Sequence, residues 1–381
     1  MFEHMPSALI TRPQELQALM ERVAREPRIA LDTEGASFHR YVDRVYLIQV
    51  STELDTALID PLALPDLSAL GAVLASEAVE IVVHDADYDL RVLDRDYGFR
   101  VRRIFDTRIA AQLVGEPAVG LAALLEKYFG IRLNKKLQRA DWSVRPLPPD
   151  MLAYAAADTQ HLLRLRDLLA DRLAAAGRTA WAEEEFQRLE QVRWAAPTHD
   201  SHLRLKGAKV LSPTSQAVLR ALFAWREKVA GAHDRSPFRV FPNEALLALA
   251  RAVPRSLEEL ALVRGVPRTL ARRHGGELLA AIEDGLASPP ERPQPTHSRR
   301  ERSDPAAVAR FERLKALRNR RAAELGLEPG VVCPNGTLHA VARAAPRSVE
   351  DLQRVEELRR WQIEALGAAP LLAAAADPPP Q

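Results

Sequence analysis

Four carboxylates and one phenol occur at three places where the chain could carry out chemistry. Asp32 and Glu34 follow an apolar run typical of a buried strand, and side chains two apart on a strand point to the same face. Asp89 follows a second strand-like run. Tyr154 and Asp158 are four apart on a helical segment and so share one helix face. Clustered carboxylates repel one another and are costly to bury, so we expect a compensating charge here.

Divalent cations are the compensation that suits these acids, because no Lys or Arg motif accompanies them. Two Mg²⁺ or Mn²⁺ ions about 3.5–4 Å apart are the usual clamp for in-line displacement at phosphorus. The two metals would be held by Asp32, Glu34, Asp89 and Asp158. Tyr154 would orient the attacking water, since a phenol with a pKa of about 10 is a poor base at neutral pH.

Each part of this set also has an ordinary structural interpretation. An Asp-x-Glu pair at a strand end often caps a helix or lies on the surface, and Tyr154 and Asp158 could simply pair across one helical turn. Asp85 and Asp87 lie close to Asp89 and compete with it for the same role. The distance from the preceding strand favours Asp89, and the joint occurrence of all three parts favours chemistry.

The elements that must position these residues are strands followed by helices. Apolar and β-branched runs bounded by polar residues predict strands at 28–33, 45–51, 56–60 and 79–84. Helical spacing follows the last strand up to Gly98, and further helices are expected at 107–113, 120–129 and 149–176. Strands covered by helices indicate an α/β layer architecture.

The second half of the chain is helical and contains an internal repeat. Residues 241–260 align without a gap on residues 333–352, an offset of 92 residues. Two copies of a small helical unit are therefore expected, at 207–287 and 303–371. The Pro- and Arg-rich stretch between them is typical of a linker, expected at 288–302, and a flexible tail is expected at 372–381.

The composition is that of a globular protein of two or three domains, with 381 residues, 47% apolar. A single cysteine, Cys333, excludes an intrachain disulfide framework, gives no reason to expect a disulfide-linked partner, and fits a reducing compartment. The sequence shows no signal peptide and no window near the ~18 apolar residues of a membrane span, so we expect a cytoplasmic protein without membrane contact. Residues 291–321 carry ten Lys/Arg and four Asp/Glu, which indicates either a polyanion contact or a solvated linker and helix face.

Three stretches of the sequence resemble the motifs of a known family. LDTEG, HDADYDL and YAAADTQHLL resemble the three exonuclease motifs of the DEDD superfamily, in the variant with tyrosine in the third motif. The resemblance is closer still to ribonuclease D, through residues 133–165, SFHRYVDRVYLIQVS and the FDT of 105–107. The helical repeats resemble HRDC modules, of which bacterial ribonuclease D typically carries two.

The resemblance implies an RNase H-like exonuclease domain over 1–200, with a mixed sheet flanked by helices, followed by two all-α HRDC bundles. In this family the matching acids bind two metals and the tyrosine assists the water. The implied activity is a metal-dependent 3′–5′ exoribonuclease that releases nucleoside 5′-monophosphates. The implied partners are RNA, in particular tRNA precursors with single-stranded 3′ ends. A DNA-directed 3′–5′ exonuclease and a catalytically silent RNA-binding scaffold are the alternatives.

Contacts to the nucleic acid are a separate question. His39, Arg40 and Arg44 follow the first motif and could reach phosphate, but surface charge or an intramolecular ion pair would explain them equally well. Trp142 and Arg145 could touch RNA, although packing and loop bracing are favoured. The helical repeats could bind nucleic acid or protein, and their sequence does not decide between the two.

Overall fold

The computed structural model describes residues 8–196, 201–290 and 304–377. The N-terminal part is built on a six-stranded mixed sheet of order β1-β4-β3-β2-β5-β6. β2 pairs antiparallel with β3 and β3 with β4, while the other pairs are parallel. The strands are β1 (Ala8–Ile10), β2 (Arg28–Gly35), β3 (Val45–Ser51), β4 (Thr56–Ile59), β5 (Glu80–Val83) and β6 (Ile104–Asp106).

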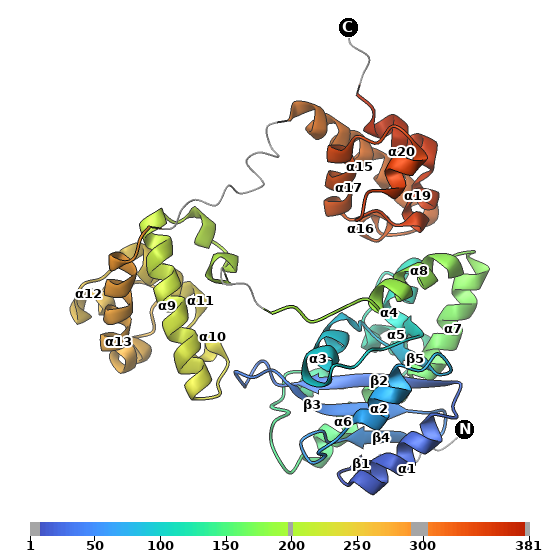
Figure 1. Cartoon of the computed structure of the whole chain (residues 1–381), viewed down its shortest axis with the longest axis horizontal. Coiled ribbons are helices and arrows are strands. Elements are labelled where there is room, and N and C mark those ends of the chain that lie inside the picture. The colour runs from blue at the N-terminus through green and yellow to red at the C-terminus, as the bar shows by residue number, and fades with distance from the viewer. Residues whose placement is uncertain (1–7, 197–200, 291–303, 378–381) are drawn as a thin grey trace.

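Helices cover both faces of this sheet (Figure 1). They are α1 (Pro13–Val23), α2 (Ser68–Leu74), α3 (Asp87–Tyr97), α4 (Thr107–Leu113), α5 (Leu121–Phe129), α6 (Pro149–Thr159), α7 (Leu162–Ala175) and α8 (Thr179–Leu189). Ile29 and Leu31 pack into the core that includes α1, α2 and α3, and Ala30 packs on the opposite side with α7 and α8. By the same alternation, Asp32 and Glu34 lie on the face of Ala30. The mixed sheet flanked by helices confirms the expected α/β architecture.

One helix differs from the elements expected from the sequence. The segment 149–176 is not one helix, because α6 ends at Thr159 and α7 begins at Leu162. The hydroxyl of Ser51 on β3 donates to the hydroxyl oxygen of Thr159 at 2.7 Å, which ties the end of α6 to the sheet. The break lets α6 pack on β2, β3 and β4 while α7 packs on β2 and β5.

The rest of the described chain forms two helical bundles, on different sides of the N-terminal domain (Figure 1). The first contains α9 (Pro213–Ala232), α10 (Pro237–Val240), α11 (Asn243–Ala252), α12 (Leu257–Leu262) and α13 (Arg268–Ala287). The second contains α15 (Pro305–Leu325), α16 (Pro329–Val332), α17 (Asn335–Ala344), α18 (Val349–Gln353), α19 (Arg360–Leu366) and α20 (Ala368–Ala375). Helix α20 buries Leu371 and Ala375, so helical order extends into the segment expected as a tail. Residues 291–302 of the expected linker and 378–381 of the expected tail lie outside the described residues.

The sequence repeat is also a structural repeat. Arg226 in the first bundle donates to the carbonyl of Phe241 and to the side-chain oxygen of Asn243. Arg318 in the second makes the same two bonds, with the carbonyl of Cys333 and the side-chain oxygen of Asn335. Both arginines are buried, because each satisfies backbone and side-chain acceptors inside its bundle.

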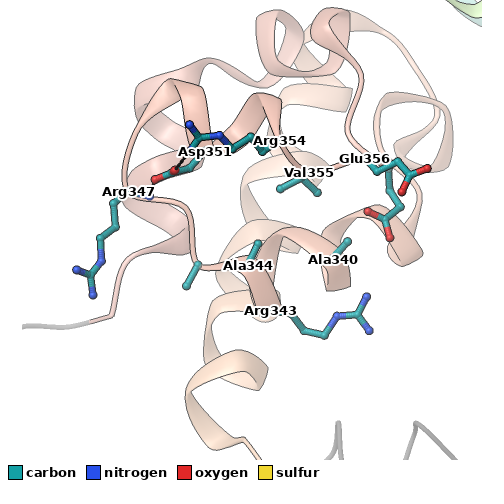
Figure 2. Close-up of a pocket in the computed structure, with 10 residues that line it drawn as sticks. Ala340, Arg343, Ala344, Arg347, Asp351, Arg354, Val355 and Glu356 are labelled. Carbon is teal, nitrogen blue, oxygen red and sulfur yellow. Dashed lines mark hydrogen bonds and ion pairs between the residues drawn. The ribbon is translucent and has the colours of Figure 1, made fainter.

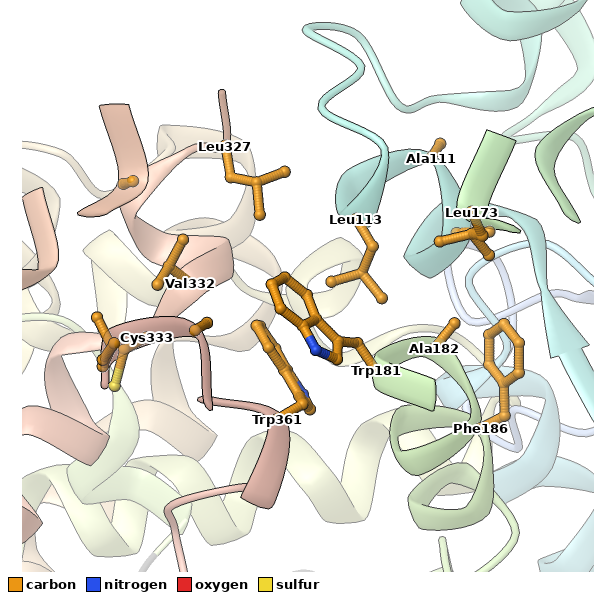
Figure 3. Packing of buried hydrophobic residues seen from close by; sticks show 14 of the residues in the cluster. Ala111, Leu113, Leu173, Trp181, Ala182, Phe186, Leu327, Val332, Cys333 and Trp361 are labelled. Atoms are coloured by element: carbon orange, nitrogen blue, oxygen red, sulfur yellow. The ribbon is translucent and has the colours of Figure 1, made fainter. Parts of the chain in front are cut away.

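Each bundle contacts the N-terminal domain through its own set of residues. The hydroxyl of Ser236 in the first bundle donates to the carbonyl of Ser37 in the loop after β2. In the second bundle, Trp361 stacks on Trp181 of α8 with ring centroids 5.2 Å apart (Figure 3). Among residues 8–196, 201–290 and 304–377, no helix combines the length and the apolar character needed to cross a membrane.

Candidate active site

The five residues singled out in the sequence line one cavity of about 420 Å³. Asp32 and Glu34 stand near the end of β2, a strand with neighbours on both sides. Asp89 lies in the first turn of α3, and Tyr154 and Asp158 lie on α6. The structure therefore brings together three segments that are far apart in the sequence.

Three of the acids are close enough to share a cation. Asp32, Glu34 and Asp158 each offer a carboxylate oxygen, and these oxygens all lie within 4.8 Å of one another. Asp89 is not in this closest group. It is buried beside it, and its carboxylate accepts a hydrogen bond from the hydroxyl of Thr33. Hard oxygen donors in this arrangement fit Mg²⁺ or Mn²⁺.

The pKa values of all four acids are raised. Desolvation in the recess is the main cause for Asp32 and Glu34, and repulsion from the neighbouring carboxylates raises their pKa further. Burial raises the pKa of Asp89 to about 7. Burial also raises the pKa of Asp158 to about 7, although a hydrogen bond from Tyr154 opposes the shift. Without a cation, this site resists the ionisation of its own side chains.

Tyr154 is protonated and packed at the wall of the cavity. Desolvation is the main cause that raises the pKa of its phenol above the usual value, and the charge of Asp158 adds to it. Its ring lies against Trp142, with centroids 6.0 Å apart. A phenol whose pKa is raised keeps its proton at neutral pH, so its hydroxyl can donate and accept hydrogen bonds but is not a general base.

Asp106 organises the site without taking part in it, and sequence reasoning missed this role. Its carboxylate accepts the backbone N–H groups of Asp85 (3.2 Å) and Ala86 (2.9 Å), just before α3. It also accepts those of Arg108 (2.8 Å) and Ile109 (3.2 Å) at the start of α4. Asp106 therefore fixes the helix that carries Asp89. The only sequence signal was its place in the family-like FDT stretch.

The structure also separates the three neighbouring aspartates. Asp85 borders the cavity, but its carboxylate pairs with Arg108. Asp87 is exposed and pairs with Arg91 at 2.8 Å. Asp89 is buried and lines the cavity beside the other acids, and its role as a metal ligand stays a prediction.

Two of the three residues expected to contact nucleic acid, His39 and Arg40, have partners within the protein. The His39 ring lies 2.9 Å from the carbonyl oxygen of Arg139. Arg40 donates to the hydroxyl of Ser143 at 2.6 Å and lies 3.6 Å from Asp234. In the described part of the chain neither residue, nor Arg44, lines the cavity. RNA contact by these three residues stays a prediction.

Trp142 and Arg145 brace the loop before α6. Trp142 is only 1% exposed. Arg145 pairs with Asp60 at 2.7 Å and donates to the carbonyl of Tyr46 at 2.7 Å. The packing interpretation of both residues therefore agrees with the geometry.

A second cavity, of about 700 Å³, lies in the second bundle and differs in chemistry (Figure 2). Arginines and acids share its lining, and Arg354 pairs with Asp351 at 3.1 Å. Within the described ranges, its acids form no group of three that could hold a metal ion. This cavity therefore has no counterpart of the acidic site at β2.

Comparisons with known proteins agree with this geometry. Residues 8–174 match the family model described as 3′-5′ exonuclease, and residues 215–282 and 307–374 match the HRDC domain. Ribonuclease D of Shewanella sp. (strain ANA-3) is 36% identical over 72% of this chain and 72% of its own. Ribonuclease D of Nitrobacter hamburgensis is 30% identical over 95% of this chain and 94% of its own.

A solved structure extends the likeness to the whole chain. The crystal structure of Escherichia coli RNase D, described as an exoribonuclease involved in structured RNA processing, superposes with a TM-score of 0.74. It is 27% identical and covers 98% of this chain and 100% of its own. The fold is thus an RNase H-like exonuclease domain followed by HRDC domains. The chain belongs to the ribonuclease D family and is a 3′–5′ exoribonuclease.

Proposed function

We propose that this enzyme hydrolyses RNA from the 3′ end with two divalent cations, Mg²⁺ or Mn²⁺, and releases nucleoside 5′-monophosphates. The observation that carries the proposal is the set of carboxylate oxygens of Asp32, Glu34 and Asp158 within 4.8 Å of one another. Their raised pKa values support it, because a recess that disfavours bare carboxylates is stabilised by a cation.

The residues have distinct roles in this proposal. Asp32, Glu34, Asp89 and Asp158 hold the cations. Bound divalent cations supply water activation and neutralise charge at the leaving oxygen. Tyr154, which hydrogen-bonds Asp158, keeps its proton and orients the attacking water. Asp106 and Thr33 hold the carboxylate of Asp89 in place.

We further propose that tRNA precursors with single-stranded 3′ ends are substrates. The similarity to Escherichia coli RNase D, an exoribonuclease involved in structured RNA processing, supports this choice. We assign residues 1–200 to catalysis and the units 207–287 and 303–371 to positioning of the RNA, joined by 288–302 and followed by the tail 372–381. Cys333, a buried free thiol, supports our expectation of a reducing, cytoplasmic setting.

The proposal is tested by digesting matched 3′-single-stranded RNA and DNA oligonucleotides, with divalent metal omitted and then restored. We expect shortening of the RNA from its 3′ end only with metal, and a strong preference for RNA. Preference for DNA would establish the DNA-directed alternative. Absence of any shortening would establish the silent scaffold.

Substitution tests the metal site itself. Asp32→Asn removes one charged ligand and is expected to lower turnover by about 10³-fold or more while leaving the fold intact. Asp87→Asn is the matched control, because Asp87 is exposed and pairs with Arg91 outside the cluster. Retained turnover in Asp32→Asn, measured beside this control, would show that the metal site is wrong.

A further inference from the structure

Two phenylalanines form an exposed aromatic pair where the first bundle meets the exonuclease domain. Phe38 is 38% exposed and Phe238 is 41% exposed. Their ring centroids are 5.0 Å apart and their planes meet at 69°. The guanidinium of Arg139 lies over the Phe38 ring at 5.0 Å from its centroid. An exposed aromatic cluster of this kind marks an interaction site more often than a scattered single residue does.

Two short chain segments connect the cluster to residues that line the active-site cavity. Phe38 is four residues after Glu34, so their Cα atoms are at most about 14 Å apart. Arg139 directly follows Gln138, which lines the cavity. A strand whose 3′ end is in the cavity would therefore reach the cluster within about four stacked nucleotides.

The first bundle holds the cluster in a fixed arrangement. The hydroxyl of Ser236 donates to the carbonyl of Ser37 at 2.5 Å, and the backbone N–H of Ser236 donates to the carbonyl of His39 at 3.3 Å. Asp234 accepts the backbone N–H of Tyr41 at 3.1 Å. Phe238 lies only two residues after Ser236 in the sequence. Both halves of the aromatic pair are thus tied to one hydrogen-bonded junction.

We propose that Phe38, Arg139 and Phe238 form a stacking platform for the nucleobases of the single strand just upstream of the 3′ terminal nucleotide. The proposal rests on the proposed function, since it requires RNA with its 3′ end in the cavity. Unpaired bases stack on aromatic rings and on Arg guanidinium planes, without a strict sequence requirement.

Charge around the platform favours a nucleic-acid strand over a protein partner. Arg139 belongs to the platform, and Arg235 and Arg239 are exposed on either side of Phe238 in the sequence. Nearby acids are already occupied: Asp234 accepts backbone N–H groups and Asp141 accepts from Ser143. Exposed cations beside aromatic faces complement phosphates and bases together.

The test compares kcat and KM for an RNA of about 12 nucleotides with those for one of about three, which reaches the cavity alone. Phe238→Leu keeps an apolar contact with Phe38 but removes the aromatic face, whereas Phe238→Tyr keeps it. We expect Phe238→Leu to raise KM for the long RNA about tenfold, with kcat and the short RNA unchanged. Phe238→Tyr is expected to retain the wild-type KM. Leu262→Ala, an exposed apolar residue elsewhere in the same bundle, is the matched control.

A second readout is independent of turnover. A 2-aminopurine placed about four nucleotides from the 3′ end reports stacking by loss of fluorescence when RNA binds the metal-free enzyme. We expect this quenching with the wild-type protein and with Phe238→Tyr, but not with Phe238→Leu. Equal quenching and equal KM for all variants would overturn the platform and leave the pair as an interdomain contact. In that case the wild-type protein still digests RNA from the 3′ end, whereas no digestion by the wild type would be the failure of the proposed function.

Discussion

Carboxylates crowded beside β2 make the metal-free protein sensitive to pH. The pKa values of Asp89 and Asp158 are raised to about 7, against about 3.9 in an unfolded chain. Between these values the folded state binds more protons than the unfolded state, so its stability falls as pH rises. We expect the urea midpoint in excess chelator to decrease from about pH 5 to about pH 7. Saturating Mg²⁺ is expected to remove most of this decrease, because the cation binds the ionised site.

The control for this prediction is Asp158→Asn, which removes one ionisation and one negative charge from the recess. Its metal-free stability is expected to vary less with pH and to exceed that of the wild type near pH 7. A wild-type midpoint that rises over the same range in chelator would contradict the raised pKa values. The measurement needs only unfolding curves and no activity.

Local spacing was enough to predict some residue neighbours and not others. The adjacency of Asp32 and Glu34 follows from the period of a strand, and that of Tyr154 and Asp158 from the period of a helix. The partners of Arg40 lie about 100 and 190 residues further along the chain, at Ser143 and Asp234. No local pattern encodes such contacts, because they form only when separate elements pack.

Asp106 joins two helices at the scale of secondary-structure elements. It caps α4 and also accepts the backbone N–H groups just before α3, the helix that carries Asp89. Asp106→Ala leaves several buried donors without a partner, and we expect a loss of about 2–3 kcal/mol in the free energy of unfolding. Turnover is expected to fall as well, because Asp89 loses its support. Urea unfolding and a 3′-digestion assay measure the two effects.

Ser348→Ala provides the control for Asp106→Ala. Ser348 caps α18 in the second bundle, where its hydroxyl oxygen accepts the backbone N–H of Asp351, and it does not line the active-site cavity. A loss of about 1 kcal/mol with unchanged turnover is expected. If Asp106→Ala had no larger effect on either measurement than Ser348→Ala, the linking role of Asp106 would be wrong.

The elements themselves were predictable where they are long or strongly patterned. The strands at 28–33, 45–51 and 79–84 correspond to β2, β3 and β5, because apolar runs with turn signals identify buried strands. The three-residue strands β1 and β6 were not identified. Each is defined by its pairing, β1 with β4 and β6 with β5, and a segment of that length has no periodicity of its own.

At the scale of the whole molecule, the repeat was visible in the sequence but its docking was not. The 92-residue offset places Ser236 of the first bundle opposite Glu328 of the second. Both bundles contact the exonuclease domain through this equivalent segment. In the second bundle, Leu325 lies three residues before Glu328, and its carbonyl accepts a hydrogen bond from Arg178 at 2.6 Å. The contacts themselves differ: the first bundle hydrogen-bonds the loop after β2 through Ser236, whereas the second stacks Trp361 on Trp181. The sequence repeat therefore predicts the fold of each helical bundle but not the residues through which it contacts the exonuclease domain.

The stacked indoles of Trp181 and Trp361 lead to a prediction about the order in which the domains unfold. Trp361 is 4% exposed, and its indole N–H donates to Glu185 of α8 at 2.7 Å. Trp361→Ala is expected to lower the free energy of unfolding by about 3–5 kcal/mol, through lost packing with Trp181 and the lost hydrogen bond to Glu185. Because the lost contact joins the exonuclease domain to the second bundle, we expect the thermal unfolding of the variant to split into two transitions.

Cys333 identifies which of these transitions belongs to the second bundle. Its thiol is fully buried, and burial raises its pKa to about 12, so a thiol reagent modifies it only when that bundle opens. In Trp361→Ala we expect labelling to follow the lower transition, while 3′ digestion persists until the upper one. Trp225→Ala is the matched control, because it removes the same side chain from the first bundle, where Trp225 packs on Phe241. Labelling and loss of digestion that coincide in Trp361→Ala would show that the second bundle and the exonuclease domain unfold as one unit without the stacked pair.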